Sequence, residues 1–196
     1  MMKLYLTPGA CSLADHIALA EARITVEPVK VDLRTRTTEH GDDFTVINPK
    51  GYVPALEFDD GSVLTENVAI IGWVSDQTPA LTPPGPLGRA RNIEMLAFLA
   101  TEVHRPFMRS MFSPAETEKQ AAREAIVARL TYLAGRIEGD YLFGDVFSGA
   151  DALFYVMVRW ARDFGYEVDG RLLDFAARVE ARPAVQAALR AEGLPA

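Results

Sequence analysis

The stretch KLYLTPGACSLADHIAL, residues 3–19, decides how the fold begins and carries the only cysteine of the chain. Its first residues form a short apolar run that predicts a β-strand, Pro8 and Gly9 predict a turn, and apolar residues at helical spacing predict a helix over about residues 12–22. Cys11 therefore falls at a helix N-terminus, where unpaired amides and the helix dipole favour negative charge. We expect a thiolate there, although a small buried cysteine is the structural alternative.

Outward from this stretch, the first 80 residues alternate between strand-like and helical patterns. The predicted strands are 3–6, 27–31, 55–58 and 62–64, the predicted helices are 12–22 and 66–76, and a polar loop with a short helix runs to residue 47. The order βαβ requires a parallel crossover, and the DDG sequence within the following ββα predicts a hairpin. Residues 1–80 are thus predicted to form an α/β domain with a mixed sheet of about four strands.

A proline-rich segment separates this half from the rest of the chain. The sequence TPALTPPGPLG, residues 78–88, contains four prolines and two glycines, which helices and strands tolerate poorly, so we predict a linker over residues 81–87. The pattern over residues 88–196 is helical almost throughout, with helices predicted at 87–112, 115–138, 149–164, 171–181 and 184–191. The second domain is therefore predicted to be all α.

Composition excludes several classes of protein. The 196 residues, 49% of them hydrophobic, suffice for a buried core, and a single cysteine cannot form an intramolecular disulfide. The sequence shows neither a leader-like start nor an apolar run of roughly 18 residues, so we expect a cytoplasmic protein that does not enter a membrane. A net charge of −7 with dispersed arginines argues against nucleic acid but permits a small anionic ligand. No metal is expected.

The thiol of Cys11 has no second cysteine for a dithiol redox site. Ala14 occupies the position where a Cys-x-x-Cys pair would have its second thiol. Any disulfide chemistry at Cys11 must therefore take its second thiol from a ligand, and glutathione is the obvious cytosolic donor.

A second group of residues suits the same ligand. In NPKGYVPALEFDDGSVLTENVAI, residues 48–70, Val53 and Pro54 begin a strand and Glu66 and Asn67 begin a helix. A cis peptide bond before the proline would present the preceding backbone N–H and C=O to an extended peptide. A carboxylate beside helix-terminal amides suits an α-amino acid, the group at one end of glutathione. Each feature alone has a structural explanation, and their combination with the cysteine favours a site.

The sequence resembles the beta class of bacterial glutathione transferases over nearly its whole length. The likeness is carried by KLYLTPGACSLADHIAL, VDLRTRTTEHGDDFTVINPKGYVPALEFDDGSVLTENVAI, TEVHRPF and FSGADALFYVMVRWA. VPAL with a later TE pair is typical of the wider superfamily, whereas PGACSLADH together with NPKGYVPAL is similar to the beta class. The resemblance implies a thioredoxin-like N-terminal domain, a helical C-terminal domain that supplies a hydrophobic acceptor site, a homodimer, and glutathione bound as co-substrate in a cleft.

The resemblance also implies roles for individual residues. They are Cys11 and His104 near the glutathione sulfur, Val53, Pro54, Glu66 and Asn67 along the peptide and its γ-glutamyl end, Arg36 at the glycyl carboxylate, and Arg105 beside the histidine. Tyr5 and Ser12 are candidate hydroxyl donors to a thiolate, and Phe107 and Trp160 are candidates for the acceptor pocket. Several of these residues also have a purely structural explanation, because loop arginines are usually solvated and apolar residues at helical spacing more often form the core. Pro106 is predicted to kink its helix.

Two positions depart from the family pattern. Ala97 stands where the family often has an asparagine that reaches glutathione across the dimer interface, so that hydrogen bond is lost. Tyr52 replaces a glutamine that often precedes the Val-Pro pair and is expected to narrow or restack the mouth of the site.

The most direct hypothesis is a glutathione transferase that activates the glutathione thiol and adds it to soft, small hydrophobic electrophiles. A first alternative is a glutathione-dependent thiol-disulfide reductase, in which Cys11 forms a mixed disulfide that a second glutathione resolves. A second alternative is a non-catalytic protein whose cleft binds apolar ligands or a partner. Turnover of an aryl halide and of a mixed disulfide, together with a glutathione titration, separates the three.

Overall fold

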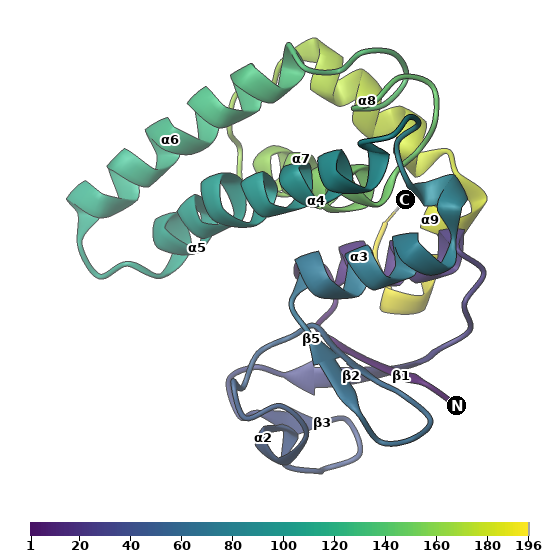
Figure 1. The fold of residues 1–196 in the computed structure, drawn as a ribbon. Coiled ribbons are helices and arrows are strands. Elements are labelled where there is room, and N and C mark those ends of the chain that lie inside the picture. Colours follow the sequence, from purple (N-terminus) through teal and green to yellow (C-terminus); the bar gives the residue numbers. More distant parts are fainter. Residues whose placement is uncertain (196) are drawn as a thin grey trace.

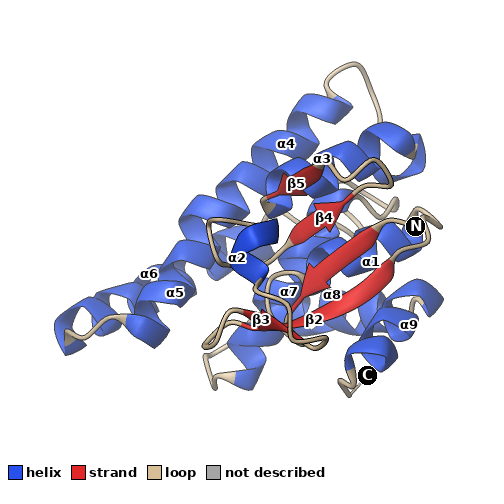
Figure 2. Ribbon diagram, turned by 90° about the horizontal axis from the view of Figure 1, so that it is seen from below, coloured by secondary structure: helices blue, strands red, loops and turns tan. Residues whose placement is uncertain are grey.

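Five strands form one mixed sheet in the N-terminal half of the computed structural model, which describes residues 1–195 (Figure 2). Their order across the sheet is β3-β2-β1-β4-β5, with bounds β1 Lys3–Leu6, β2 Glu27–Asp32, β3 Thr37–Thr38, β4 Ala55–Glu57 and β5 Val63–Thr65. β1 pairs in parallel with β2 and antiparallel with β4, and β4 and β5 form the hairpin predicted from the DDG turn. The predicted βαβ-ββα order is confirmed.

The prediction of four strands is wrong by one. The fifth strand, β3, consists of two residues that pair antiparallel with Val31 and Asp32 of β2. A two-residue strand in a polar segment is too short to show an alternating apolar pattern, so the sequence gives no signal for it.

The two faces of the sheet are covered by different helices. Leu4 and Leu6 of β1 pack into the core formed with α1 (Leu13–Glu21) and α3 (Asn67–Gln77). Tyr5 points to the opposite face and joins the small cluster around Phe44 of α2 (Phe44–Ile47). This alternation along β1 is the period-two pattern of a strand buried on both faces.

The C-terminal half is helical, as predicted, and forms its own layers away from the sheet (Figure 1). Its elements are α4 Gly88–Phe98, a π-helical segment η2 Leu99–His104, α5 Arg105–Phe112, α6 Glu116–Ala134, α7 Gly149–Asp163, α8 Gly170–Glu180 and α9 Pro183–Glu192. A 3-10 turn η1, Pro79–Leu81, precedes them and overlaps the first residue of the predicted linker. A capping box of Ser148 and Asp151 begins α7, which is buried along most of its length.

The helix that carries His104 continues past Pro106 instead of breaking at it. Proline has no N–H to donate, and its ring crowds the carbonyl four residues earlier. The six residues of η2 adopt π-helical geometry just before the proline, so the chain stays helical from α4 to the end of α5. A π-helical segment therefore lies directly before the proline, a feature often found at functional sites.

α1 joins the two halves of the molecule because it packs against α3, α7 and α9. Arg182, which precedes α9, donates two hydrogen bonds to the carboxylate of Glu21 at the end of α1, at 2.6 and 2.9 Å. The helix after Cys11 is thus held by elements from the far end of the chain. Within residues 1–195, no helix combines the length and the apolar character needed to cross a bilayer.

Candidate functional site

Cys11 lies in the turn between β1 and α1, facing the start of β4. Its Sγ is 3.7 Å from the backbone carbonyl of Val53, and the Val53–Pro54 peptide bond is cis, the condition under which the sequence analysis expected this backbone to be open to a peptide. β4 is the antiparallel neighbour of β1 in the sheet, which brings the two segments together. The thiol and the predicted peptide-binding edge therefore lie side by side.

The expectation that Cys11 is a thiolate is wrong for this structure. Burial, and then the nearby carboxyl of Asp15, raise the pKa of the Cys11 thiol to about 12, against a smaller opposing effect of the backbone amides of Cys11 and Ser12. The helix terminus is present, but desolvation of a buried anion outweighs it. Cys11 is a neutral thiol at pH 7.

The turn that carries Cys11 is fixed from both ends. The Ser12 hydroxyl accepts a hydrogen bond from the Thr7 N–H at 3.2 Å and donates to the Thr7 carbonyl at 3.4 Å, so it ties the turn instead of pointing to a ligand. Gly9, at φ +72°, donates its N–H to Glu192 of α9 at 2.9 Å and accepts from the Trp160 indole at 2.8 Å. Two helices of the C-terminal half thus hold this glycine.

Glu66, at the start of α3, has an unusual backbone conformation. Its φ is +76°, a left-handed conformation rare for a residue with a side chain and typical of functional sites. The Glu66 carboxylate accepts hydrogen bonds from Lys50 Nζ at 2.5 Å and from the Tyr52 hydroxyl at 2.8 Å. Lys50 is the main cause that lowers the pKa of Glu66, so the carboxylate is ionised at neutral pH.

Lys50 is a site residue that the sequence analysis missed. It lies within the quoted NPKGYVPAL motif, two residues before Tyr52, but nothing in the motif shows that its ammonium would reach a carboxylate 16 positions later. Its Nζ also donates to the Thr65 hydroxyl at 2.9 Å. The predicted anchor for a ligand ammonium therefore already has an ammonium partner.

Asn67 turns its side chain inward. Its amide nitrogen donates to the carboxylate of Asp15 at 2.6 Å and to the backbone carbonyl of Cys11 at 3.0 Å. The side chain is thus committed to α1, and what Asn67 can offer a ligand is its backbone N–H in the first turn of α3. Asp15, fully buried on α1, is a second residue that the sequence analysis missed, although it lies four residues after Cys11.

Arg36 borders the same region from the loop before β3. It is exposed and has φ +58°, and Gly51 leaves the room that its side chain occupies: a Cβ on Gly51 would come within 3.2 Å of Arg36 Nε. Arg36 therefore stands beside the residue that precedes Tyr52, with its guanidinium open to solvent, where a carboxylate could pair with it.

Tyr5 is not part of this group. Its ring is buried on the sheet face covered by α2, and its hydroxyl donates to Glu57 at 2.6 Å. Burial and Glu57 raise the pKa of Tyr5, so the phenol stays protonated. The prediction of Tyr5 as a hydroxyl donor near the thiol is wrong, because strand alternation turns the side chain away from α1.

His104 joins the Cys11 turn through Trp160. The two rings are 5.5 Å apart, and the indole of Trp160 is the group that donates to Gly9. Burial lowers the pKa of His104, partly offset by the charge of Glu66, and its buried Nε2 has no hydrogen-bond partner among the described residues. His104 is thus a neutral imidazole with an unused nitrogen. Arg105, next along the chain, is exposed.

The aromatic side chains near Trp160 divide into core and surface. Phe107 is fully buried and packs against Trp160 and Tyr166, each at a ring distance of 5.5 Å, so the prediction that it contacts an acceptor is wrong. Trp160 is 8% exposed, whereas Phe164 is 49% exposed and lies 6.5 Å from it. Phe164, which the sequence analysis did not single out, is the more accessible aromatic surface.

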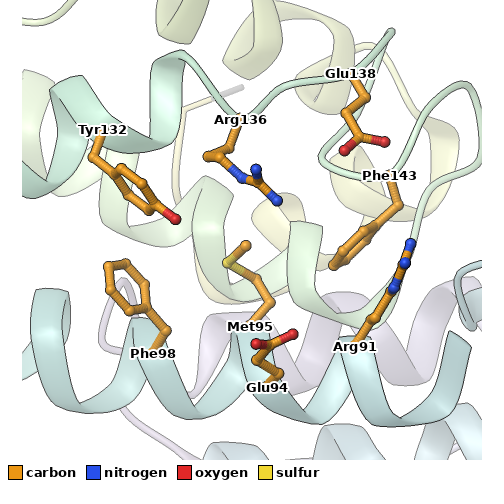
Figure 3. A pocket seen from close by; sticks show the side chains of 8 residues that line it. All are labelled: Arg91, Glu94, Met95, Phe98, Tyr132, Arg136, Glu138 and Phe143. Carbon is orange, nitrogen blue, oxygen red and sulfur yellow. The ribbon is translucent and has the colours of Figure 1, made fainter. Parts of the chain in front are cut away.

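A separate groove lies between α4, α6 and the loop after α6 (Figure 3). Its lining residues are Arg91, Glu94, Met95, Phe98, Tyr132, Arg136, Glu138 and Phe143. None of them is a predicted glutathione-site residue. The groove combines apolar side chains with charges of both signs.

Comparisons with known proteins point to one family. Residues 10–77 match the family model described as glutathione S-transferase, N-terminal domain, and residues 96–187 match its C-terminal domain. The glutathione S-transferase GstA of Escherichia coli O157:H7 is 40% identical over 98% of this chain and 100% of its own length.

Solved structures agree with this result. A bacterial beta class glutathione S-transferase from Sphingomonas chungbukensis has a TM-score of 0.91 and 43% identity, covering 98% of this chain and 100% of the other. A sphingomonad glutathione S-transferase solved with glutathione has a TM-score of 0.89 and 44% identity, again covering 98% and 100% of the two chains.

Proposed function

This chain belongs to the glutathione S-transferase family, and we propose that it activates the thiol of glutathione beside Cys11 and conjugates it to soft electrophiles. The observation that carries this proposal is the 3.7 Å approach of the Cys11 sulfur to the Val53 carbonyl. A peptide paired with the backbone of Val53 would have its own cysteine close to that sulfur. Glutathione is a short peptide with one thiol, and the beta class resemblance agrees with this placement.

The charged ends of glutathione match the two ends of the proposed site. The γ-glutamyl ammonium would pair with the ionised Glu66, and its carboxylate would accept from the first backbone N–H groups of α3. The glycyl carboxylate would pair with the exposed guanidinium of Arg36. To reach Glu66, the ligand must share or replace the hydrogen bonds from Lys50 and Tyr52.

Activation consists of stabilising the glutathione thiolate. The thiol loses its proton, and the anion attacks the electrophilic carbon, so that a carbon–sulfur bond forms while a halide or similar group leaves with its bonding electrons. Cys11, held as a neutral thiol, can donate its S–H to that anion. The neutral His104, with an unused ring nitrogen, can accept a proton within the same wall of the site.

The acceptor side would be formed by aromatic surface of the helical half. Trp160 borders the Cys11 turn, and Phe164 offers exposed ring surface next to it. Phe107 packs against the rings of both Trp160 and Phe164 and supports them from the core side. A soft hydrophobic electrophile fits this surface better than a charged one does.

A homodimer and a cytoplasmic location are part of the proposal. The groove of Figure 3 places Met95, Phe98 and Tyr132 among arginines and glutamates, a combination that suits an interface with a second copy of the chain. The single cysteine supports a reducing compartment.

The test is a calorimetric titration with glutathione, followed by turnover of one aryl halide and one mixed disulfide. We expect binding and conjugation in the wild type, and a loss of affinity in Glu66→Ala larger than in Arg36→Ala, because Arg36 is the more solvated group. Glu124→Ala, which removes an exposed carboxylate on α6, is the matched control. Dominant turnover of the disulfide would support the reductase alternative, and failure to bind glutathione would contradict the proposal.

A further inference from the structure

Asp15 is a buried carboxyl that the proposed mechanism does not use. It lies in the first turn of α1 with no exposed surface, and its Oδ1 has no hydrogen-bond partner among the described residues. Its Oδ2 accepts a hydrogen bond of 2.6 Å from the side-chain amide of Asn67. An unpaired oxygen on a fully buried carboxyl is costly, so its presence in a fold calls for an explanation.

The side chain of Asn67 joins two segments of the proposed site. Its amide nitrogen carries two hydrogens and donates twice, to Asp15 and, at 3.0 Å, to the backbone carbonyl of Cys11. Because the amide group is planar, the acceptor of one N–H fixes the direction of the other. Asp15 therefore holds the amide in the orientation that reaches the Cys11 turn from the start of α3.

This contact closes a ring of contacts around the proposed site. The Cys11 sulfur lies 3.7 Å from the carbonyl of Val53. Tyr52, the residue before Val53, donates its hydroxyl to Glu66 at 2.8 Å. Asn67, the residue after Glu66, returns to the Cys11 carbonyl. Side chains of the site itself thus fix the separation between the sulfur of Cys11 and the start of α3.

We propose that Asp15 is a positioning residue for peptide recognition: it holds the Asn67 amide against the Cys11 turn, and the separation set in this way fits a γ-linked glutamyl peptide better than its α-linked isomer. The inference rests on the proposed function, because it places the two ends of glutathione as that proposal does. It adds the feature of the peptide that is selected, which is the linkage of the first residue, and the side chain that imposes the selection.

The linkage changes where the charged groups of the peptide lie. In glutathione the glutamate is joined through its side-chain carboxyl, so the ammonium and a free carboxylate share one carbon, two methylene groups beyond the amide. In the α-linked isomer the ammonium lies next to the amide, and the free carboxylate is at the end of the side chain. The two isomers have the same composition and charge. A site with a fixed distance from the cysteine to its α-amino-acid anchor therefore distinguishes them by geometry.

Loss of the Asp15 carboxyl should loosen this distance. A buried amide hydrogen without an acceptor is unfavourable, so Asn67 would turn towards another partner and leave the Cys11 carbonyl. Glu66 and the first N–H groups of α3 would remain, but the ligand itself would have to order them, which costs affinity. The γ-linked peptide spans both ends of the site and should lose affinity. The α-linked peptide cannot span both and should not.

The experiment measures the dissociation constants of S-methylglutathione and of its α-linked isomer by calorimetry, with competition for the weaker ligand. The methyl group blocks the thiol of the peptide, so no disulfide forms with Cys11 and recognition alone is measured. We expect the wild type to prefer the γ-linked peptide. In Asp15→Ala the affinity for that peptide should fall about fivefold, the equivalent of one net hydrogen bond, whereas the affinity for the isomer should stay within about twofold.

Two further variants separate positioning from a general loss of stability. Asp15→Asn keeps a side-chain oxygen that can accept from Asn67, so the ratio of the two dissociation constants should match that of the wild type. Ser75→Ala is the matched control, because Ser75 is buried on the same helix, α3, and its hydroxyl donates to the Ile71 carbonyl at 2.9 Å. Its ratio should also match the wild type, although packing of α3 is weakened.

Because Asp15 acts through Asn67, the effects of the two side chains should not add. Asn67→Ala should lower the ratio as Asp15→Ala does, and the double variant should equal either single variant. An unchanged ratio in folded Asp15→Ala, or additive effects in the double variant, would overturn the proposal. If Asp15→Ala does not fold, Asn67→Ala decides, and a wild-type ratio in that variant would overturn the proposal.

Failure of the proposed function would give a different result. A wild type that binds neither peptide would contradict the proposed function and this inference with it. A wild type that binds S-methylglutathione without preferring it to the α-linked isomer would contradict the inference alone. The same holds for a preference that persists in Asp15→Ala.

Discussion

The indole nitrogen of Trp160 donates a hydrogen bond of 2.8 Å to the backbone carbonyl of Gly9, 151 positions earlier in the chain. The ring that donates it also lies against His104 and Phe107. A helix of the C-terminal half thereby sets the position of the turn that carries the cysteine, so the geometry of the proposed site depends on the packing between the two halves.

Replacing Trp160 by phenylalanine removes this hydrogen bond and keeps an aromatic ring. We expect Trp160→Phe to lower the free energy of unfolding by about 1 kcal/mol, the net contribution of one hydrogen bond, and to weaken glutathione binding. Urea unfolding and calorimetry measure the two effects. Trp73→Phe is the control, because Trp73 packs edge-on against Phe58 in the other half. Equal glutathione affinity in wild type and Trp160→Phe would contradict a positioning role.

In the proposed complex, Lys50 would compete with the ammonium of glutathione for Glu66, because its Nζ already donates to that carboxylate. An exposed ion pair contributes up to about 1 kcal/mol, so removing the Lys50 ammonium in Lys50→Met should tighten glutathione binding by up to roughly fivefold. Lys119→Met, which removes an ammonium paired with Glu116 on α6, should leave the affinity unchanged. Weaker binding in Lys50→Met would show that Lys50 belongs to the ligand site instead of competing with it.

Asp151 should make the fold less stable as pH rises through the acid range. Burial is the main cause that raises the pKa of Asp151 to about 6, above the usual value of an aspartate in an unfolded chain. The folded state therefore holds this proton more tightly, and its contribution to the free energy of unfolding is present below about pH 4 and is lost towards pH 6. Two pKa units correspond to about 3 kcal/mol.

The comparison of wild type with Asp151→Asn isolates this contribution. Asparagine does not titrate, so the variant should lack that part of the pH dependence between about pH 4 and pH 6, even though its capping box is weakened. Urea unfolding at several pH values gives both curves. Parallel curves for the two proteins would mean that Asp151 does not titrate in this range.

The groove between α4 and α6 should be the dimer interface. Tyr132 is 54% exposed there and its ring lies 5.6 Å from that of Phe98. Placing a charge in this apolar contact by Tyr132→Glu should give a monomer in sedimentation velocity, where the wild type should sediment as a dimer. Gln120→Glu adds the same charge at an exposed position of α6 and should remain dimeric. A monomeric wild type would contradict the proposal directly.

Much of the fold could be predicted from the sequence because its signals are local. Apolar periodicity located the helices to within a few residues, and the DDG turn predicted the β4–β5 hairpin. The two-residue β3 and the π-helical segment before Pro106 gave no comparable signal. The first is shorter than one alternation, and the second depends on how the helix accommodates a proline.

The geometry of the candidate site was predictable where a motif fixes the backbone and not where distant side chains meet. Cys11 and Val53 were identified from the turn and the strand start that hold them. The contacts of Lys50 with Glu66 and of Asp15 with Asn67 join separate elements, and sequence spacing does not reveal them. Which aromatic side chain of the helical half is exposed likewise depends on tertiary packing, so the sequence analysis named the buried Phe107 and did not single out the exposed Phe164.

The hydrogen bond from Gly9 to Glu192 spans 183 positions, so it can form only after nearly the whole chain has been synthesised. Domains generally begin to fold from the N-terminus while the ribosome is still elongating the chain. The sheet can form early, but the turn with Cys11 lacks this partner until Glu192 has left the exit tunnel. A nascent or prematurely released chain would therefore contain the cysteine without the clamp that positions it, and full glutathione binding should emerge only once translation has passed α9.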